Sequence, residues 1–141
     1  MGKIKTIKEI YNCEYFSKDN EQYSIPAWHN KVIDKKITEL SVFDVARMLR
    51  QKVFIEVGVN RAIAFLYEDP FAGDIFIGEL LKLILSCEYK YLIPYIDDLK
   101  KIAKEARERS KQFFQNFNDD ETFQEDEKVF LSCISFIENN L

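Results

Sequence analysis

Apolar residues recur every three or four positions along most of the chain, which is the spacing of one face of an α-helix. The pattern is clearest after Pro94, where an apolar stripe opposes a face rich in lysine and arginine. Its members are Ile96, Leu99, Ala103, Ala106, Ser110, Phe113 and Phe117. A second stripe consists of Phe123, Phe130, Ile134 and Ile137. The two stripes predict two long amphipathic helices, separated by a break at residues 118–120.

Two short helices are predicted near the N-terminus. The first follows from the helical spacing of Ile4, Ile7 and Tyr11. Residues 17–27 are polar and form a loop, and the second helix starts near Pro26, because proline suits a first helical turn. Three of its residues are expected to face the core, namely Trp28, Val32 and Ile37.

Ser41 and Asp44 mark the start of the next helix, since a serine followed three residues later by an acidic residue resembles a helix N-cap. Val42, Val45 and Leu49 then form an apolar stripe at helical spacing. A helix is therefore predicted from about residue 42.

Residues 52–67 are apolar on nearly all sides, which is typical of a helix in the middle of a bundle. The β-branched residues within 53–59 would also suit a strand. Asp69 ends this segment, because the residue before Pro70 avoids the helical conformation.

The stretch EDPFAGDIFIGELL, residues 68–81, connects two apolar segments and holds four carboxylates. Its PFAGD portion predicts a turn in which Gly73 takes a positive φ. Asp74 is then expected to be the N-cap or a first-turn acid of a helix whose apolar face begins at Leu80. Glu79 would lie on that helix, beside its apolar face.

The predicted fold is all-α, a compact single-domain bundle of about five or six helices over residues 1–141. A length of 141 residues is usual for one domain. The chain holds only four glycines and three prolines, too few for the many turns of a β-sandwich. Helices joined by short connections pack as a bundle.

The net charge is −4, and it is unevenly distributed along the chain. Residues 1–70 carry 11 basic and 10 acidic side chains, whereas residues 71–141 carry 9 basic and 14 acidic ones. An acidic half repels nucleic acid and attracts basic proteins. A protein partner is therefore expected, and direct binding of nucleic acid is not.

An acidic run stands out near the C-terminus, where six of nine consecutive residues are acidic. They are Asp119, Asp120, Glu121, Glu125, Asp126 and Glu127. Such a run favours a helix N-terminus, and it would equally attract a strongly basic partner. We therefore predict that these six residues bind the partner. The six basic residues between 100 and 111 alternate with glutamates and fit a solvated helix face.

No stretch approaches the roughly 20 apolar residues of a membrane span. The N-terminus also lacks the apolar run of a signal peptide. A cytoplasmic protein without membrane contact is therefore expected.

No catalytic set, metal site or cofactor is predicted. The three cysteines are widely spaced and form no CxxC motif. His29 is the only histidine and could act as a base, but a lone histidine on an amphipathic helix is more often a packed residue. Asp69, Asp74 and Glu79 could bind a metal, although roles as caps and turn formers explain them better.

Arg47 and Arg50 are three residues apart and share a helix face with Phe43 and Phe54. An arginine that is partly covered by aromatic rings requires a carboxylate partner. One interpretation is an internal salt bridge, for instance to Asp69 or Glu79. The other is a contact with a phosphate or a protein partner. We favour the internal salt bridge, because an acidic protein supplies carboxylates in excess.

Three segments stand in order along the first part of the chain: WHNKV at 28–32, VARMLRQ at 45–51 and DPFAGD…GELL at 69–81. Together they resemble the immunity proteins of bacterial contact-dependent growth inhibition (CDI) systems, the CdiI family. The resemblance covers about residues 26–81. It places in the family pattern Trp28, His29, Lys31, Arg47, Met48, Leu49, Arg50, Gln51, Pro70, Ala72, Gly73, Glu79, Leu80 and Leu81. Where the family often has an acidic residue before the second glycine, this chain has Ile77.

The resemblance implies a small cytoplasmic protein that binds and neutralises the C-terminal domain of its cognate toxin. Such toxins are frequently nucleases that cut RNA, often tRNA, and the bound protein would cover the active cleft or the substrate-docking face. An acidic binder suits a basic nuclease. Two other classes stay open: a helical regulatory or scaffold module with another protein partner and, more weakly, a carboxylate-dependent metal hydrolase.

Overall fold

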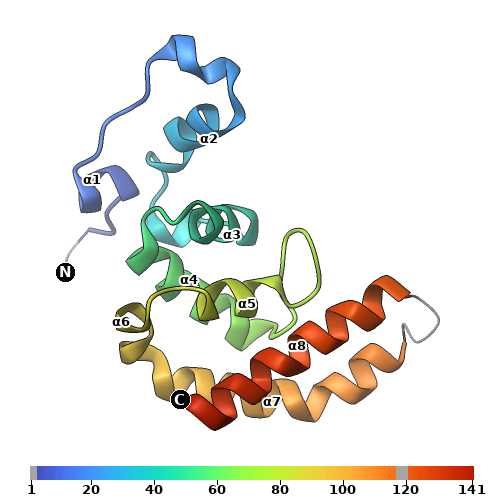
Figure 1. Cartoon of the computed structure of the whole chain (residues 1–141). Helices are drawn as coiled ribbons and strands as arrows, with labels where there is room; N and C mark the ends of the chain where they lie inside the picture. The colour runs from blue at the N-terminus through green and yellow to red at the C-terminus, as the bar shows by residue number, and fades with distance from the viewer. Residues whose placement is uncertain (1–2, 117–120) are drawn as a thin grey trace.

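The computed structural model describes residues 3–116 and 121–141, and every regular element in these ranges is helical (Figure 1). The α-helices are α1 (Ile7–Tyr11), α2 (Ser24–Val32), α3 (Val42–Gln51), α4 (Ile55–Glu68), α5 (Glu79–Leu85), α6 (Tyr89–Leu92), α7 (Ile96–Gln115) and α8 (Glu121–Asn140). The 3-10 helices are η1 (Lys18–Gln22), η2 (Ile37–Glu39) and η3 (Ile93–Tyr95). These ranges contain no strand, so the all-α prediction is confirmed.

The chain forms more helices than the five or six predicted. The short N-terminal helix α1 was predicted, whereas α6 was not, because its four residues are too few to display a period. None of the helices within the described ranges is both long and apolar enough to cross a membrane. A single domain over residues 1–141 stays a prediction.

Helix α4 lies at the centre of the fold and contacts α3, α5, α6 and α7. Its buried residues are Gly58, Val59, Ala62, Ile63 and Leu66. The prediction of a central helix is therefore confirmed, and the strand alternative for 53–59 is wrong. The backbone at Phe54 has a left-handed φ of 53°, which a strand does not accommodate, and α4 begins at the next residue.

Helices α7 and α8 form an antiparallel hairpin that packs on α4 and α5 (Figure 1). The buried residues of α7 are Leu99, Ile102, Ala103, Ala106, Ser110 and Phe114. The predicted stripe is therefore confirmed from Leu99 to Ser110, while its members Ile96 and Phe113 are half-buried and Phe114 is the buried residue near the end of the helix. Phe117 and the predicted break at 118–120 lie outside the described residues. Helix α8 follows its predicted stripe and buries Phe130, Cys133, Ile134 and Ile137.

Helix α2 begins at Ser24, so Pro26 lies in its first turn and the predicted loop at 17–27 contains η1 as well. Trp28 is buried as predicted. Val32 is buried as well, and Ile37 is half-buried and packs against the core although α2 ends before it.

Helix α3 has the predicted cap. The Asp44 N–H donates to Ser41 Oγ, and the Ser41 N–H donates to Asp44 Oδ2, each at 3.1 Å. This reciprocal capping box satisfies two backbone donors at the start of the helix. Asp69 ends α4 as predicted, and its N–H donates to the Phe65 carbonyl at 2.8 Å.

Candidate functional site

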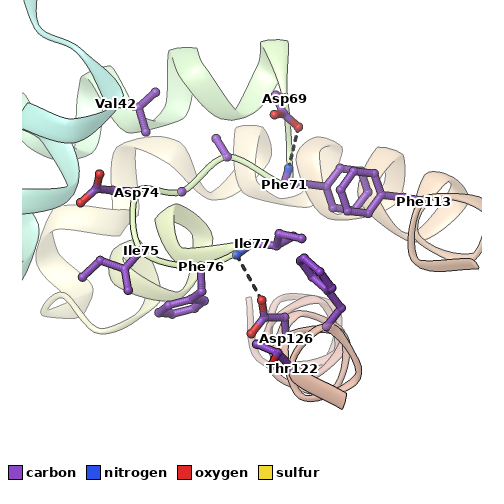
Figure 2. A pocket seen from close by; sticks show the side chains of 13 residues that line it. Val42, Asp69, Phe71, Asp74, Ile75, Phe76, Ile77, Phe113, Thr122 and Asp126 are labelled. Atoms are coloured by element: carbon purple, nitrogen blue, oxygen red, sulfur yellow. Dashed lines mark hydrogen bonds between the residues drawn. The ribbon is translucent and has the colours of Figure 1, made fainter. Parts of the chain in front are cut away.

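The connection between α4 and α5, residues 69–78, forms one wall of a groove whose opposite wall is the start of α8 (Figure 2). The groove has a volume of about 620 Å³. Its aromatic lining comes from Phe71, Phe76, Phe113 and Phe123. Its carboxylates are Asp69, Asp74 and Asp126.

The turn in this connection differs from the predicted one. Among the described glycines only Gly78 has a positive φ, of 80°, and it is the N-cap residue of α5. The prediction of a positive φ at Gly73 is wrong. Gly73 is nevertheless required, because a Cβ at this position would lie 2.1 Å from the Phe76 carbonyl oxygen. The backbone folds back on itself too closely for any side chain.

Gly73→Ala should therefore lower the free energy of unfolding by about 1–3 kcal/mol, since the carbonyl of the folded-back turn must move. The matched control is Gly58→Ala in α4. There the closest atom is Leu49 Cδ2 at 3.0 Å, the end of a flexible side chain. Alanine also gains about 1 kcal/mol of helix propensity over glycine, so the control should change little. Urea unfolding measures both, and equal midpoints would contradict the close approach.

Arg50 joins this connection to α3. Its Nη2 donates to Asp74 Oδ2 at 2.8 Å, and its Nε lies 3.5 Å from Glu79 Oε2. The predicted internal salt bridge from Arg50 to Glu79 is therefore confirmed. The predicted cap at Asp74 is wrong, because α5 begins only at Glu79 and Asp74 turns toward Arg50 instead.

Glu79 is 2% exposed and braces the turn from inside. Its Oε1 accepts the backbone N–H of Asp74 at 3.0 Å and that of Ile75 at 2.9 Å. One carboxylate therefore satisfies two loop donors and faces the Arg50 guanidinium, so the loop, α5 and α3 are held together at this point.

Asp69 has a separate role, since its Oδ1 accepts the Phe71 N–H at 2.9 Å and closes a tight turn after α4. Asp74 and Glu79 thus share the Arg50 guanidinium, whereas Asp69 serves a turn of its own. Within residues 3–116 and 121–141, no three potential metal-ligating side chains gather at one point. The hydrogen bonds of Asp69 and Glu79 support the interpretation of these two carboxylates as turn formers.

Stacked phenylalanines form the base of the groove. The rings of Phe71 and Phe113 are nearly parallel, with centroids 3.9 Å apart, and Phe71 also contacts Phe130 at 4.9 Å. Asp126 on α8 ties the opposite wall to the connection, because its Oδ2 accepts the Ile77 N–H at 3.4 Å (Figure 2). The groove therefore lies between two segments that are bonded to each other.

The structure divides the predicted acidic run. Glu121 and Glu125 are exposed on the first turns of α8, and Glu125 pairs with Lys128 at 3.3 Å. Asp126 and Glu127 are half-buried, and Asp126 lines the groove. The remaining two residues, 119 and 120, lie outside the described residues.

A second hollow, which we call the α2–α3 pocket, has a volume of about 390 Å³. Its charged and aromatic lining consists of Trp28, Lys31, Lys35, Phe43, Asp44 and Arg47. Buried Asp44 holds it together. Its Oδ1 accepts the Trp28 indole N–H at 3.2 Å, and its Oδ2 accepts from Lys35 Nζ at 2.7 Å. Burial alone would raise the pKa of Asp44, but Lys35, the Ser41 N–H and Trp28 hold this pKa below its ordinary value.

Arg47 lines the same pocket, and here the predicted internal salt bridge is wrong. Its Cζ lies 5.4 Å from the centroid of the Trp28 ring and 5.7 Å from that of Phe43. Its Nη2 donates to Ser24 Oγ at 3.2 Å. Among the described residues no carboxylate lies within ion-pair distance of Arg47. The aromatic contacts come from Trp28 and Phe43, and Phe54 instead packs on Tyr11.

His29 is packed, which is the interpretation favoured by the sequence. Its ring contacts Phe16 and Phe54, with centroids at 4.6 and 5.8 Å, and Nε2 lies 3.1 Å from the Glu14 carbonyl oxygen. It lines neither the groove nor the α2–α3 pocket.

Residues 75–77 were missed as part of the site. Ile75 is 66% exposed, and Phe76 and Ile77 line the groove beside it. The available signal is three apolar residues in a row directly after the predicted PFAGD turn and before the apolar face that begins at Leu80.

These features describe a small helical protein with an aromatic groove and a charged pocket. Comparison with protein families matches residues 9–102 to the family described as CDI immunity proteins, so the chain belongs to that family. The match contains the whole resembling segment 26–81 and ends within α7, so α8 lies beyond it. The searches of curated proteins and of solved structures found no match.

Proposed function

We propose that the protein acts in the cytoplasm, where it binds the C-terminal toxin domain of its own CDI system and covers its active cleft or substrate-docking face. Membership of the CDI immunity proteins is the observation that carries this proposal. An immunity protein protects by binding a toxin, so the partner is a protein.

The toxin that suits this chain best is a basic nuclease, for example one that cuts tRNA. The net charge of −4 and the acidic excess in residues 71–141 favour a basic partner. A nuclease carries such a surface, since it binds the phosphate backbone of its substrate. An acidic protein can occupy that surface in place of the nucleic acid.

The proposed binding surface is the groove together with the exposed start of α8. Ile75 and Phe76 offer apolar contact area of the kind found at interface centres. Glu121 and Glu125 lie on the helix that forms the far wall, where rim charges steer association. The groove thus combines an apolar centre with an acidic edge.

The first experiment is co-purification with the toxin domain encoded beside this gene, followed by an RNA-cleavage assay. We expect a stoichiometric complex with a Kd near or below about 1 nM, about −12 kcal/mol, because protection requires that almost no free toxin persists. A toxin domain that cuts RNA equally well with the protein present would refute the proposal. If the protein binds and inhibits a toxin domain whose own activity is not that of a nuclease, only the proposed nuclease class of the toxin is refuted.

Neutralising the acidic run should slow association with the toxin by about tenfold at low salt and flatten the salt dependence of the rate. A first variant changes four residues of the run to the corresponding amides: the exposed Glu121 and Glu125, and the preceding Asp119 and Asp120. Asp126 and Glu127 are added in a second variant, since Asp126 also supports the loop through Ile77.

The matched control removes the same charge elsewhere on the exposed surface, by amide substitutions at Glu88, Asp97, Glu105 and Glu108. Stopped-flow association at two salt concentrations compares the sets, and melting curves confirm folding. Equal association rates for the acidic-run variant and the control variant would show that the net charge, and not the start of α8, steers association with the toxin.

A further inference from the structure

We propose that the α2–α3 pocket receives a carboxylate side chain of the toxin domain, held by Arg47 and Lys31. This inference rests on the proposed function and adds to it a contact of opposite charge from the acidic start of α8. The occupant follows from the charge and the hydrogen-bonding capacity of the pocket.

The two arginines of α3 differ in their carboxylate partners. They share one face of the helix, yet Arg50 has two carboxylates of its own chain, Asp74 and Glu79. Arg47 has a single neutral acceptor, Ser24 Oγ, and no carboxylate within the described residues. A guanidinium carries five N–H donors in a planar fork, so most of the hydrogen-bonding capacity of Arg47 is unused by the described residues.

The position of Arg47 is fixed before any partner arrives. Trp28 and Phe43 flank its guanidinium, and Trp28 is itself held by the hydrogen bond to Asp44. Aromatic contact removes part of the water around a guanidinium and leaves its edge free for a bidentate acceptor. A preorganised arginine loses little conformational entropy on binding, which favours affinity.

The pocket carries an excess of positive charge in an acidic protein. Lys31, Lys35 and Arg47 line it, against one carboxylate, that of Asp44. Lys35 is paired with Asp44 at 2.7 Å, whereas Lys31 is exposed and forms no ion pair with the described residues. Two cations thus face one hollow without compensation, so the complementary group is an anion. Since the partner is a protein, that anion is an aspartate or glutamate.

One partner can reach both hollows, because each has a lining residue at the start of α3. Val42 lines the groove and the next residue, Phe43, lines the pocket (Figure 2 shows Val42 at the edge of the groove). A toxin that places basic groups at α8 would place an acidic group at Arg47. Adjacent sites of opposite sign specify one orientation and penalise a partner with the wrong charge pattern.

The test measures dissociation of the toxin domain from wild type, Arg47→Gln, Arg47→Lys and Lys31→Gln. We expect Arg47→Gln to raise the dissociation rate by about 30-fold or more, because a desolvated charged pair acts mainly on dissociation. Arg47→Lys should recover part of the loss, since it keeps the charge without the fork. Lys31→Gln should give a smaller increase, of about three- to tenfold.

The matched control is Arg61→Gln, which removes the same charge from a guanidinium that also lies over a ring, 5.5 Å from the centroid of Phe65, but lines neither hollow. Its dissociation rate should equal that of wild type. If Arg47→Gln does not fold, the exposed Lys31 variant still decides the question. Folded variants that dissociate like wild type would overturn the pocket while leaving the proposed function intact.

Two further outcomes are distinct. Failure of wild type to bind the toxin domain would overturn the proposed function and this inference with it. Retention of a short RNA by wild type, but not by Arg47→Gln, would assign the pocket to a phosphate and overturn the carboxylate.

Discussion

Replacing Glu79 by alanine should lower the free energy of unfolding by about 3 kcal/mol. The side chain is 2% exposed and accepts two backbone N–H groups, from Asp74 and Ile75. Without it both donors lose a charged acceptor, and Arg50 loses one of its two carboxylates. The loss is moderated because Arg50 keeps Asp74 at 2.8 Å. For a chain of this size the melting temperature should fall by roughly 10 °C.

Two control variants separate the loss of the hydrogen-bond acceptor at Glu79 from the loss of its charge. Glu79→Gln keeps an oxygen for the two loop donors and removes the charge, so about 1 kcal/mol should be lost. Glu88→Ala removes an exposed carboxylate that lies 3.7 Å from Lys90, and it should change stability by no more than about 0.5 kcal/mol. A wild-type melting temperature for Glu79→Ala would show that the loop does not depend on this carboxylate. Because Glu79 supports one wall of the groove, the same variant should also bind the toxin domain less tightly.

Several helices and helix ends were predictable from the sequence, because they depend on neighbours close in the chain. The stripes of α7 and α8 need only a repeat of three and four residues. The capping box of Ser41 and Asp44 spans three positions, and the end of α4 at Asp69 follows from the proline after it. Each of these features is local, so no knowledge of the tertiary fold was needed.

The connection at 69–78 was not predictable, because residues outside it decide its shape. Turn rules predict a positive φ at Gly73, but it is the approach of the Phe76 carbonyl that excludes a side chain there. They predict a cap at Asp74, but Arg50 of α3 binds this carboxylate instead. Turn rules treat a segment alone, whereas here a helix that is distant in sequence competes for the same carboxylate.

The two arginines show the same limit. Their spacing placed them on one helix face, and an acidic chain made internal salt bridges the favoured interpretation for both. Which arginine pairs with a carboxylate depends on where the 69–78 connection lies along α3. The connection lies at Arg50, whereas Arg47 lies beside α2 and contacts Trp28 and Ser24.

Replacing Asp44 should have an effect of similar size to replacing Glu79, and it should depend on pH. Asp44→Asn keeps the shape of the side chain but puts an NH₂ group where one oxygen accepts a hydrogen bond. Both oxygens are used, since Trp28 donates to Oδ1 while Lys35 and the Ser41 N–H donate to Oδ2. We expect a loss of about 3 kcal/mol at pH 7, against about 1 kcal/mol for Ser41→Ala, which removes only the cap.

The pH dependence follows from the lowered pKa of Asp44 in the folded protein. A carboxyl whose pKa is lower in the folded than in the unfolded chain stabilises the fold above its unfolded pKa, about 3.9, and this contribution disappears as the pH falls through the folded value. The stability difference between wild type and Asp44→Asn should therefore be constant from about pH 7 to 5 and shrink below about pH 4. Urea midpoints measured at each pH give this difference. If the stability difference between the two proteins grows on acidification, the fold stabilises the protonated carboxyl of Asp44. The ionised carboxylate, paired with Lys35, would then not be the group that holds Trp28 beside Arg47.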